Sequence, residues 1–337
     1  MLLSQFDYEL PEAAIAQVPM VPRDASRLLV LHRDTGAREH RVFREVLNYL
    51  QAGDTLVLND TRVIPARVRA VKETGGRVEL LLLARRAPGE WEASVRPGRR
   101  VPPGARLYVP RGDLQVEVLS RTAAGGRVVR VSGAEDADAA LLAAGEVPLP
   151  PYIHQPLADS ERYQTVYAAH AGSAAAPTAG LHFTPELLAQ AQSLGVAVAR
   201  VTLHIGLATF QPVRVEAIAA HVMHVERYFV SPEAAAVINA TPGRVVAVGT
   251  TTTRVLESVA DEAGRVRPGA GETQLYITPG YRFRVVDALV TNFHTPRSTL
   301  LIMVSAFAGR ERILDAYREA LERGYRFLSF GDAMLLL

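Results

Sequence analysis

The pattern of apolar and polar positions divides the chain into three parts. Near the N-terminus, short apolar runs at 26–31 and 55–58 are typical of buried strands, and apolar residues at helical spacing over 41–51 predict a helix between them. From about residue 66 to residue 132 the pattern changes to short β-type runs. After a helix predicted near 136–144, strand and helix patterns alternate to the end of the chain.

The middle part has six β-type runs, separated by turns rich in Gly and Pro such as Gly75-Gly76 and Pro97-Gly98. Short strands at close spacing with turn signals between them predict a small antiparallel barrel. The runs lie at 66–72, 77–84, 91–96, 106–109, 114–121 and 127–132. We therefore predict an α/β main domain with an inserted small antiparallel β-barrel domain. The main domain comprises residues 1–65 and 147–337, and the insert comprises residues 66–146.

The last part has clear helix signals. Thr184 and Ser231 are good N-caps, and each is followed by a proline at the first helical position. The apolar pattern predicts strands at 198–204, 244–248, 274–278 and 284–292, and helices at 255–263, 299–308 and 310–323.

Composition excludes several kinds of chemistry. The 337 residues are 48% hydrophobic and 21% charged, as in an ordinary globular protein, and there is no cysteine. Disulfides, thiolate nucleophiles and cysteine-bound zinc are therefore excluded, and only a His/carboxylate metal site remains open. We find no signal-peptide pattern and no apolar run of about 18 residues that would span a bilayer. A cytoplasmic protein without a membrane segment is expected.

Charge is unevenly distributed along the chain. The net charge is only +2, but the stretch from Arg62 to Arg130 has 14 Arg and Lys72 against six acids, a net +9 that leaves −7 for the rest. Arginine suits phosphate and stacks on bases, so this stretch is a candidate nucleic-acid surface. Genomic base composition or thermal adaptation would also explain the choice of arginine over lysine, but neither would explain the clustering.

Several segments place polar residues at predicted strand ends, where open α/β sheets bind ligands. In the segment 176–183, Thr178 and His182 are suited to hydrogen-bond a ligand or exchange a proton. The alternative is a loop with a packed histidine ahead of the helix capped by Thr184. His204 also lies near a strand end, where a histidine in an apolar run is more often a core residue.

Two further strand ends carry polar groups. Gly249 and four threonines lead into a helix that contains Arg254, a combination suited to hold a carboxylate or phosphate at a helix N-terminus. The alternative is that the threonines only cap the helix. Asn292 and His294 follow an apolar strand in the same way.

Other readings have weaker support. His221, His224 and Glu226 lie close together and form a candidate metal site, but they lack the HExxH form. The chain has neither a Walker A loop nor a G-x-G-x-x-G motif after a strand, so classical nucleotide-binding functions are not expected.

The quoted segments resemble one family, the S-adenosylmethionine:tRNA ribosyltransferase-isomerases of the queuosine pathway (the QueA family). The resemblance covers almost the whole chain in order. Its segments are 56–67, 149–153, 163–167, 176–183, 202–213, 221–228, 246–254, 288–300 and 325–334. Two departures occur: Leu207 replaces a small residue of the family's Gly-rich segment, and Thr252-Thr253 stands where the family usually has Ser-Val.

The resemblance implies transfer and isomerisation of the ribosyl group of S-adenosylmethionine onto 7-aminomethyl-7-deazaguanine at the wobble position of a tRNA. The products are epoxyqueuosine-tRNA, adenine and methionine. S-adenosylmethionine is then a co-substrate, no metal or other cofactor is expected, and the protein is expected to be a monomer. A base such as His204 or His182 would remove the proton next to the sulfonium, and His294 or a carboxylate would assist departure of adenine.

The predicted site residues follow from this resemblance and from the segments above. The candidate catalytic residues are His182, His204 and His294. The candidate S-adenosylmethionine-binding residues are Thr178, Gly180, Gly249, Thr250, Thr251, Arg254 and Asn292, and the candidate tRNA-binding residues are Arg62, Arg96, Arg99 and Arg100.

Two other functions remain open from the sequence. A non-catalytic RNA-binding protein would explain the basic insert but not the polar strand ends. A metal-dependent hydrolase would use His221, His224 and Glu226.

Overall fold

The computed structural model of the protein describes residues 1–122, 125–206, 213 and 215–337. Their contacts form two compact units. The α/β unit comprises residues 1–61, 150–170 and 176–337, and the barrel unit comprises residues 62–149 and 171–175. The short return of the chain at 171–175 was not predicted. It arises because β11 (His170–Ser173) pairs with β4 (Thr61–Val63).

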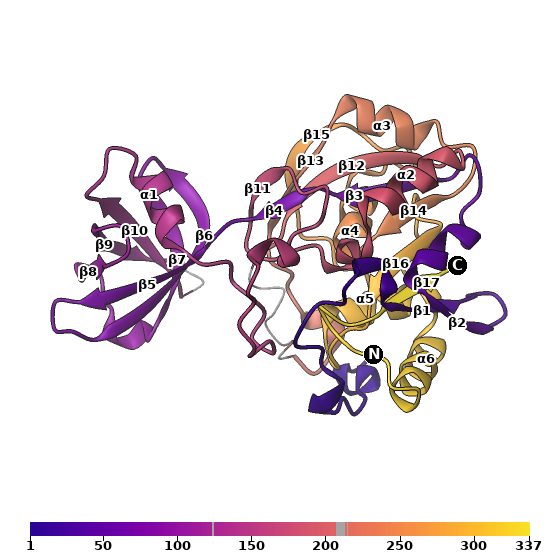
Figure 1. Cartoon of the computed structure of the whole chain (residues 1–337), viewed down its shortest axis with the longest axis horizontal. Coiled ribbons are helices and arrows are strands. Elements are labelled where there is room, and N and C mark those ends of the chain that lie inside the picture. Colours follow the sequence, from indigo (N-terminus) through magenta and orange to yellow (C-terminus); the bar gives the residue numbers. More distant parts are fainter. Residues whose placement is uncertain (123–124, 207–212, 214) are drawn as a thin grey trace. The chain divides into compact units, whose positions relative to one another are not determined.

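The α/β unit is built on a mixed sheet that has nine strands within the described residues, in the order β15-β13-β12-β3-β14-β16-β17-β1-β2 (Figure 1). Its four central strands, β12, β3, β14 and β16, are mutually parallel. Antiparallel pairs extend the sheet beyond β12 and β16, except that β17 and β1 are parallel to each other. The strands are β1 (Arg27–Leu31), β2 (Arg38–Val42), β3 (Thr55–Asn59), β12 (Ala197–His204), β13 (Glu226–Val230), β14 (Val245–Val248), β15 (Gly269–Thr273), β16 (Ala288–Asn292) and β17 (Ala333–Leu336).

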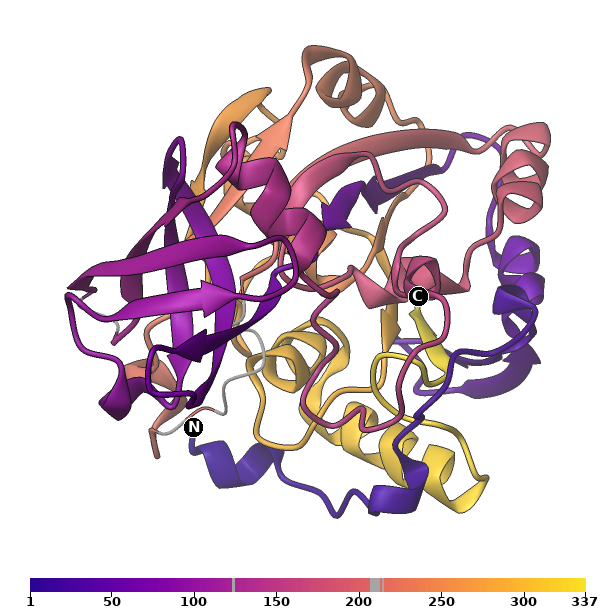
Figure 2. The same ribbon diagram turned by 60° about the vertical axis from the view of Figure 1, so that its left-hand side comes forward.

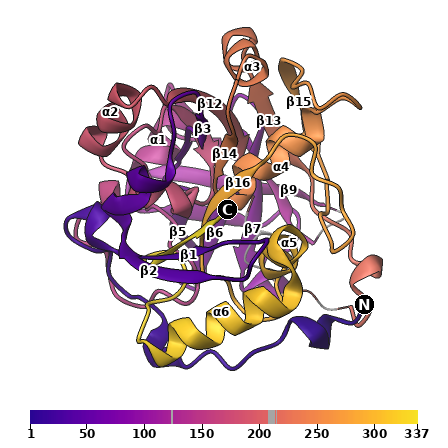
Figure 3. The same ribbon diagram turned by 90° about the vertical axis from the view of Figure 1, so that its right-hand side faces the viewer.

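Helical segments cover both faces of this sheet. β3, β14 and β16 are buried along their whole length, as expected for parallel strands covered on both sides. One face packs its apolar side chains against α2 and the 3₁₀ helices η4 and η7. α3 and α4 also pack against the sheet, and α5 and α6 lie side by side (Figure 3). The helices are α2 (Pro185–Ser193), α3 (Pro232–Asn239), α4 (Thr250–Val259), α5 (Thr299–Ala308), α6 (Arg310–Glu322), η1 (Leu3–Phe6), η2 (Glu12–Ala14), η3 (Arg23–Ala25), η4 (Phe43–Tyr49), η6 (Ser160–Tyr163), η7 (Thr178–His182) and η9 (Ile218–Ala220).

The cap signals located helix starts correctly. The Thr184 hydroxyl accepts a hydrogen bond from the backbone N–H of Leu187, and the Ser231 hydroxyl accepts one from Ala234. Each cap satisfies a backbone donor that the helix leaves without an internal partner. α2 and α3 therefore begin where the sequence predicts.

Four predicted elements were wrong in type, position or length. The strand predicted over 284–292 is β16, which begins only at Ala288. The helix predicted over 41–51 is the shorter 3₁₀ helix η4. The helix predicted over 255–263 is α4, which begins at Thr250 because Gly249, at φ +94°, turns the chain directly from strand into helix. The strand predicted over 274–278 is not formed. There the carbonyl of Leu275 accepts a hydrogen bond from Arg254 Nε instead of a strand partner.

The barrel unit is a closed barrel (Figure 2). Its strand order is β10-β7-β6-β5-β8-β9, and every neighbouring pair is antiparallel. Alternate residues of its strands point inward and form one apolar core that includes Trp91. Both parts of the predicted fold class are therefore confirmed. The elements are β5 (Arg67–Lys72), β6 (Arg77–Ala87), β7 (Glu90–Arg96), η5 (Gly98–Arg100), β8 (Arg106–Val109), β9 (Leu114–Arg121), β10 (Arg127–Ser132) and α1 (Ala137–Ala144).

Among the described residues, no helix is long and apolar enough to cross a membrane.

Candidate functional site

The carboxyl ends of the four central parallel strands lie next to one another along one edge of the sheet. β12 ends at His204, β3 at Asn59, β14 at Val248 and β16 at Asn292. Candidate residues that are far apart in the sequence therefore follow neighbouring strands at one edge. This is the edge at which parallel α/β sheets bind ligands.

Asn59 connects three elements at this edge, and the sequence reasoning missed it. Its side-chain amide donates to the carbonyl of Leu203 and to the hydroxyl of Thr251, both at 3.2 Å. Its amide oxygen accepts from the backbone N–H groups of Leu203 (3.0 Å) and Thr61 (3.2 Å). The signal was the Asn-Asp-Thr sequence directly after the buried strand at 55–58. Asn59 thus ties the end of β3 to β12 and to the first turn of α4.

His204 is half-buried and is oriented by Thr61, whose hydroxyl lies 2.8 Å from Nδ1. Within the described residues no hydrogen bond involves the other ring nitrogen, Nε2. Burial lowers the pKa of His204 below its usual 6.5, with further lowering by His170 and Arg227, whereas Asp60 acts in the opposite direction. The ring is therefore held in position and is neutral at pH 7.

Asp60 and His170 accompany His204, and neither was predicted as a site residue. The Asp60 carboxylate is almost fully buried and accepts a 2.6 Å hydrogen bond from the Thr202 hydroxyl. Its other oxygen lies 3.6 Å from Nε2 of His170, which is largely exposed. The edge of the sheet thus carries a second imidazole next to a carboxylate.

His182 is buried, and both of its ring nitrogens have protein partners. The Ser26 hydroxyl lies 2.7 Å from Nδ1 and also bonds to the carbonyl of Arg23, so Nδ1 is the donor in the contact with Ser26. Nε2 then accepts from the Asn292 amide at 3.2 Å. Burial, with smaller contributions from Arg326 and Arg23, lowers the pKa of His182 to about 3. His182 is therefore a neutral hydrogen-bonding group.

Thr178 and Asn292 belong to the same network. The Thr178 hydroxyl donates to the Asn292 side-chain oxygen at 2.9 Å, and the Asn292 amide also lies 3.4 Å from the carbonyl of Leu328. The structure thus brings together three of the predicted residues, Thr178, His182 and Asn292. Their hydrogen bonds to one another tie η7 to the end of β16.

The His294 side chain is buried. Its Nδ1 is 3.2 Å from the Tyr317 hydroxyl, and its Nε2 is 3.3 Å from the Thr291 hydroxyl. Burial lowers its pKa to about 3. The structure therefore surrounds His294 with protein partners, as it does His182.

The N-terminus of α4 follows β14 without a loop. Thr252 and Thr253 bond back to the carbonyls of Val248 (2.7 Å) and Gly249 (3.2 Å), so these two hydroxyls serve the helix itself. Thr250 and Thr251 occupy the first turn, where backbone N–H groups point out of the helix.

Arg254 does not project from the helix end into open space. It forms a buried ion pair with Glu226 through Nη1, and its Nε donates to the carbonyl of Leu275 at 3.2 Å. Glu226 in turn accepts from the backbone N–H of Gly206 at 3.2 Å, two residues after His204. The guanidinium thus connects α4 to the segment that carries His204.

This ion pair also bears on the metal hypothesis. Glu226 is bound to Arg254, and His221 packs edge-on against the ring of Tyr276 at a centroid distance of 5.4 Å. In the part of the chain that the structure describes, no three His, Cys, Asp or Glu side chains are grouped to hold a metal ion. His221, His224 and Glu226 therefore do not form the candidate metal site.

Gly180 is required by packing. A Cβ atom built on it would lie 1.9 Å from the Tyr167 hydroxyl and 2.9 Å from Thr165. We expect Gly180→Ala to destabilise the protein by about 1–3 kcal/mol, because overpacking forces side chains out of their rotamers. Denaturant unfolding measures this loss. Combining Gly180→Ala with Tyr167→Phe removes the clashing hydroxyl and should recover part of the stability, whereas unchanged stability of the single variant would contradict the packing role.

The predicted tRNA-binding arginines belong to the barrel unit. Arg96, Arg99 and Arg100 are exposed at and just after the end of β7, whereas Arg62 is half-buried in β4. Leu207, the departure from the family pattern, lies outside the described residues.

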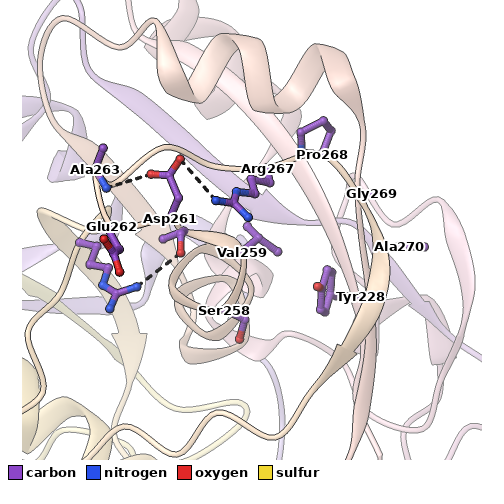
Figure 4. Close-up of a pocket in the computed structure, with 12 residues that line it drawn as sticks. Tyr228, Ser258, Val259, Asp261, Glu262, Ala263, Arg267, Pro268, Gly269 and Ala270 are labelled. Carbon is purple, nitrogen blue, oxygen red and sulfur yellow. Dashed lines mark hydrogen bonds and ion pairs between the residues drawn. The ribbon is translucent and has the colours of Figure 1, made fainter.

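A hollow of about 650 Å³ lies at the other end of α4 (Figure 4). Its wall includes Ser258, Asp261, Glu262, Arg267 and Arg284, so acidic and basic groups are mixed. The Asp261 carboxylate accepts hydrogen bonds from the backbone N–H groups of Ala263 and Arg265. None of the predicted site residues lines this hollow, and the strand ends remain the candidate site.

The chain is similar to known proteins over almost its whole length. Residues 3–336 match the family described as queuosine biosynthesis protein. The chain is 58% identical to the S-adenosylmethionine:tRNA ribosyltransferase-isomerase of Moorella thermoacetica and 56% identical to that of Pelotomaculum thermopropionicum, with 100% of both chains covered in each case. A crystal structure of S-adenosylmethionine tRNA ribosyltransferase from Thermotoga maritima is 42% identical, with a TM-score of 0.58, and the match covers 99% of this chain and 100% of that one.

Proposed function

The chain belongs to the queuosine biosynthesis protein family, and from that membership we propose that it is an S-adenosylmethionine:tRNA ribosyltransferase-isomerase. It transfers and isomerises the ribosyl group of S-adenosylmethionine onto 7-aminomethyl-7-deazaguanine at the tRNA wobble position. Adenine and methionine leave, and epoxyqueuosine-tRNA is formed. A non-catalytic RNA-binding protein is not retained, because full-length relatives carry the name of an enzyme.

His204 is the base in this proposal. A sulfonium acidifies the adjacent 5′ carbon, and removal of that proton begins opening of the ribose ring and loss of adenine. A base must be neutral before it acts and must have a nitrogen directed at the substrate. His204 is neutral, is oriented through Nδ1 by Thr61, and has no hydrogen bond to Nε2 within the described residues. This is the observation that carries the assignment.

His182 and His294 act as positioning groups in the same proposal. Their ring nitrogens already have protein partners, and protonation of either ring would break a buried network. The pair of Asp60 and His170 is better placed to handle the second proton, the one that assists departure of adenine. His170 is exposed, and its Nε2 lies 3.6 Å from the Asp60 carboxylate.

The methionine carboxylate is assigned to the N-terminus of α4. Thr250 and Thr251 supply backbone N–H groups and a hydroxyl at the positive end of the helix dipole. Gly249 makes the turn that exposes them, since its own N–H donates to the carbonyl of Val290 at 2.8 Å. Thr178, Gly180 and Asn292 shape the neighbouring wall from η7 and β16. Arg254 contributes through Glu226, since its guanidinium is already paired.

The tRNA is assigned to the barrel unit, with Arg62, Arg96, Arg99 and Arg100 among its contacts. The unit contains the whole +9 segment of the sequence. Arginine binds phosphate through two parallel N–H donors. The proposal includes a monomer that works in the cytoplasm, where its tRNA substrate is found, and needs no cofactor besides the co-substrate.

The reaction itself tests this function. The protein is incubated with S-adenosylmethionine and a tRNA that carries the aminomethyl base, and we expect free adenine and methionine together with a mass gain on the tRNA. The same tRNA with unmodified guanine is the control and should give no adenine. Formation of S-adenosylhomocysteine with a methylated tRNA would contradict the proposal.

A further inference from the structure

The antiparallel strands of the barrel unit place its basic residues near one or the other of the two ends of the barrel. Because all neighbouring strands are antiparallel, β5, β7 and β9 finish at the same end of the barrel at which β6, β8 and β10 begin. We call this end the rim. Its exposed or half-buried basic residues are Lys72, Arg77, Arg96, Arg99, Arg100, Arg106 and Arg121. The opposite end, the base, is the end at which the chain enters β5.

Most arginines toward the base are paired with acids. Arg111, in the β8–β9 turn at that end, is exposed and forms no ion pair within the described residues. Arg85 pairs with Asp138 at 2.6 Å, and Arg86 pairs with Glu92. Arg130 pairs with Glu90 at 2.9 Å. Arg67 and Arg69 likewise lie near Glu79 and Glu146. These side chains therefore have local partners and contribute little net potential.

The rim is different. Among the described residues, none of its arginines forms an ion pair, and Lys72 donates to the carbonyl of Arg100. The acids placed near the rim by sequence and register are Glu73, Glu79 and Glu117. Glu79 lies opposite Arg96 in the strand register, and its carboxylate is 3.7 Å from Nε of Arg67. One end of the barrel thus has an excess of positive charge, with seven basic side chains against three acids.

A buried arginine organises the loops that form this rim. Arg127 is only 5% exposed, and its guanidinium donates to four backbone carbonyls. Two belong to the β7–β8 connection, Gly98 (2.7 Å) and Val101 (3.0 Å), and two belong to the β9–β10 turn, Gly125 (3.0 Å) and Gly126 (2.9 Å).

Burying a cation without a counterion is costly unless its donors are satisfied, and here carbonyls satisfy them. The hydrogen bonds to Gly98 and Val101 flank η5, which carries Arg99 and Arg100. Arg127 therefore holds these two exposed arginines in one arrangement next to the β9–β10 turn.

We propose that the rim of the barrel is a binding surface for the phosphodiester backbone of the tRNA, with Arg127 as the positioning residue beneath it. The inference rests on the proposed function for the identity of the RNA. Unpaired arginines at loop ends suit contacts with successive phosphates, which orient the RNA without reading its bases. Reading of the aminomethyl base is left to the α/β unit.

Two matched triple variants test the rim. The rim variant carries Arg77→Gln, Arg106→Gln and Arg121→Gln, and the base variant carries Arg85→Gln, Arg86→Gln and Arg130→Gln. Both lose the same formal charge, and none of these residues belongs to the proposed active site. We expect the rim variant to bind tRNA at least tenfold more weakly and to lower the slope of log Kd against log salt concentration by about 0.7–0.9 per lost contact. The base variant should bind within about threefold of the parent protein.

The variant Arg127→Lys tests whether the arrangement of the loops matters apart from net charge. Lysine keeps the positive charge, but its ammonium group cannot donate to all four carbonyls. We expect weaker tRNA binding at unchanged net charge. Trp91 is the only tryptophan of the chain, lies in the barrel core and donates to Asp138 at 2.6 Å, so its fluorescence reports whether the barrel is folded. If Arg127→Lys unfolds the barrel, the two triple variants still decide the question.

The outcomes are distinct. Equal loss of affinity in the rim and base variants, or no loss in either, would overturn the rim and assign tRNA binding to overall charge or to another surface. Adenine release at saturating tRNA should be retained by the rim variant. If the parent protein binds tRNA through the rim but releases no adenine from S-adenosylmethionine, the proposed function fails while the rim stands.

Discussion

Replacing His204 by alanine is expected to lower kcat by about 10²–10⁴-fold, the usual contribution of a general base, while the fold and the affinity for S-adenosylmethionine are retained. The side chain is half-buried at the end of β12, and its only hydrogen bond among the described residues is to the Thr61 hydroxyl. Removing the imidazole therefore leaves no buried charged group without its partner. Single-turnover adenine release measures the chemical step, and thermal unfolding checks the fold.

The pH profile gives this prediction a second readout. A base acts when deprotonated, so kcat/KM should rise with pH as His204 loses its proton and then level off. Burial and the neighbouring His170 lower the pKa of His204, so the rise should be centred below 6.5. This rise of kcat/KM with pH should disappear in the His204→Ala variant. His224→Ala, which changes an exposed histidine, is the control and should leave the profile unchanged.

Full activity in the His204→Ala variant would assign this residue to packing. The same outcome would return attention to His170, the other imidazole at this edge of the sheet.

Replacing Arg254 by methionine is expected to cost about 3–5 kcal/mol of unfolding free energy, because it leaves Glu226 as an unpaired buried charge. The two side chains are 7% and 6% exposed, and Glu226 also accepts from the backbone of Gly206. The double variant Arg254→Met with Glu226→Gln removes both charges and should recover most of the loss. Urea denaturation of the three variants, with the Glu226→Gln single variant included, gives the coupling between the two residues.

This experiment also separates two roles of Arg254. If its guanidinium bound the methionine carboxylate directly, Arg254→Met would raise KM for S-adenosylmethionine with little change in stability. Such a result would contradict the structural role assigned to the Glu226–Arg254 pair and restore the direct contact that the sequence pattern suggested.

Most of the fold could be predicted from local signals. The barrel strands were located because Gly- and Pro-rich turns interrupt short β-type runs, a property of neighbouring residues. The caps at Thr184 and Ser231 are equally local. The strand predicted over 274–278 failed because a distant side chain, Arg254, takes the hydrogen bond that a strand partner would need.

The candidate site was predicted only in part. The strand ends that carry His204, Gly249 and Asn292 could be predicted, because polar residues follow apolar runs there. Asn59 and Asp60 were missed although they follow the apolar run at 55–58 in the same way. Only the strand order, with β3 between β12 and β14, brings them next to the other site residues.

The sequence by itself determined the family, the order of elements, and the concentration of arginine in one insert. Only the tertiary structure distinguished the three candidate histidines and separated the ion-paired arginines from the rim. Whether an imidazole is engaged depends on partners far along the chain: Ser26 is 156 residues from His182, and Thr61 is 143 residues from His204. Burial and hydrogen bonding set the protonation state of a side chain, and both are properties of the folded chain that no local pattern contains.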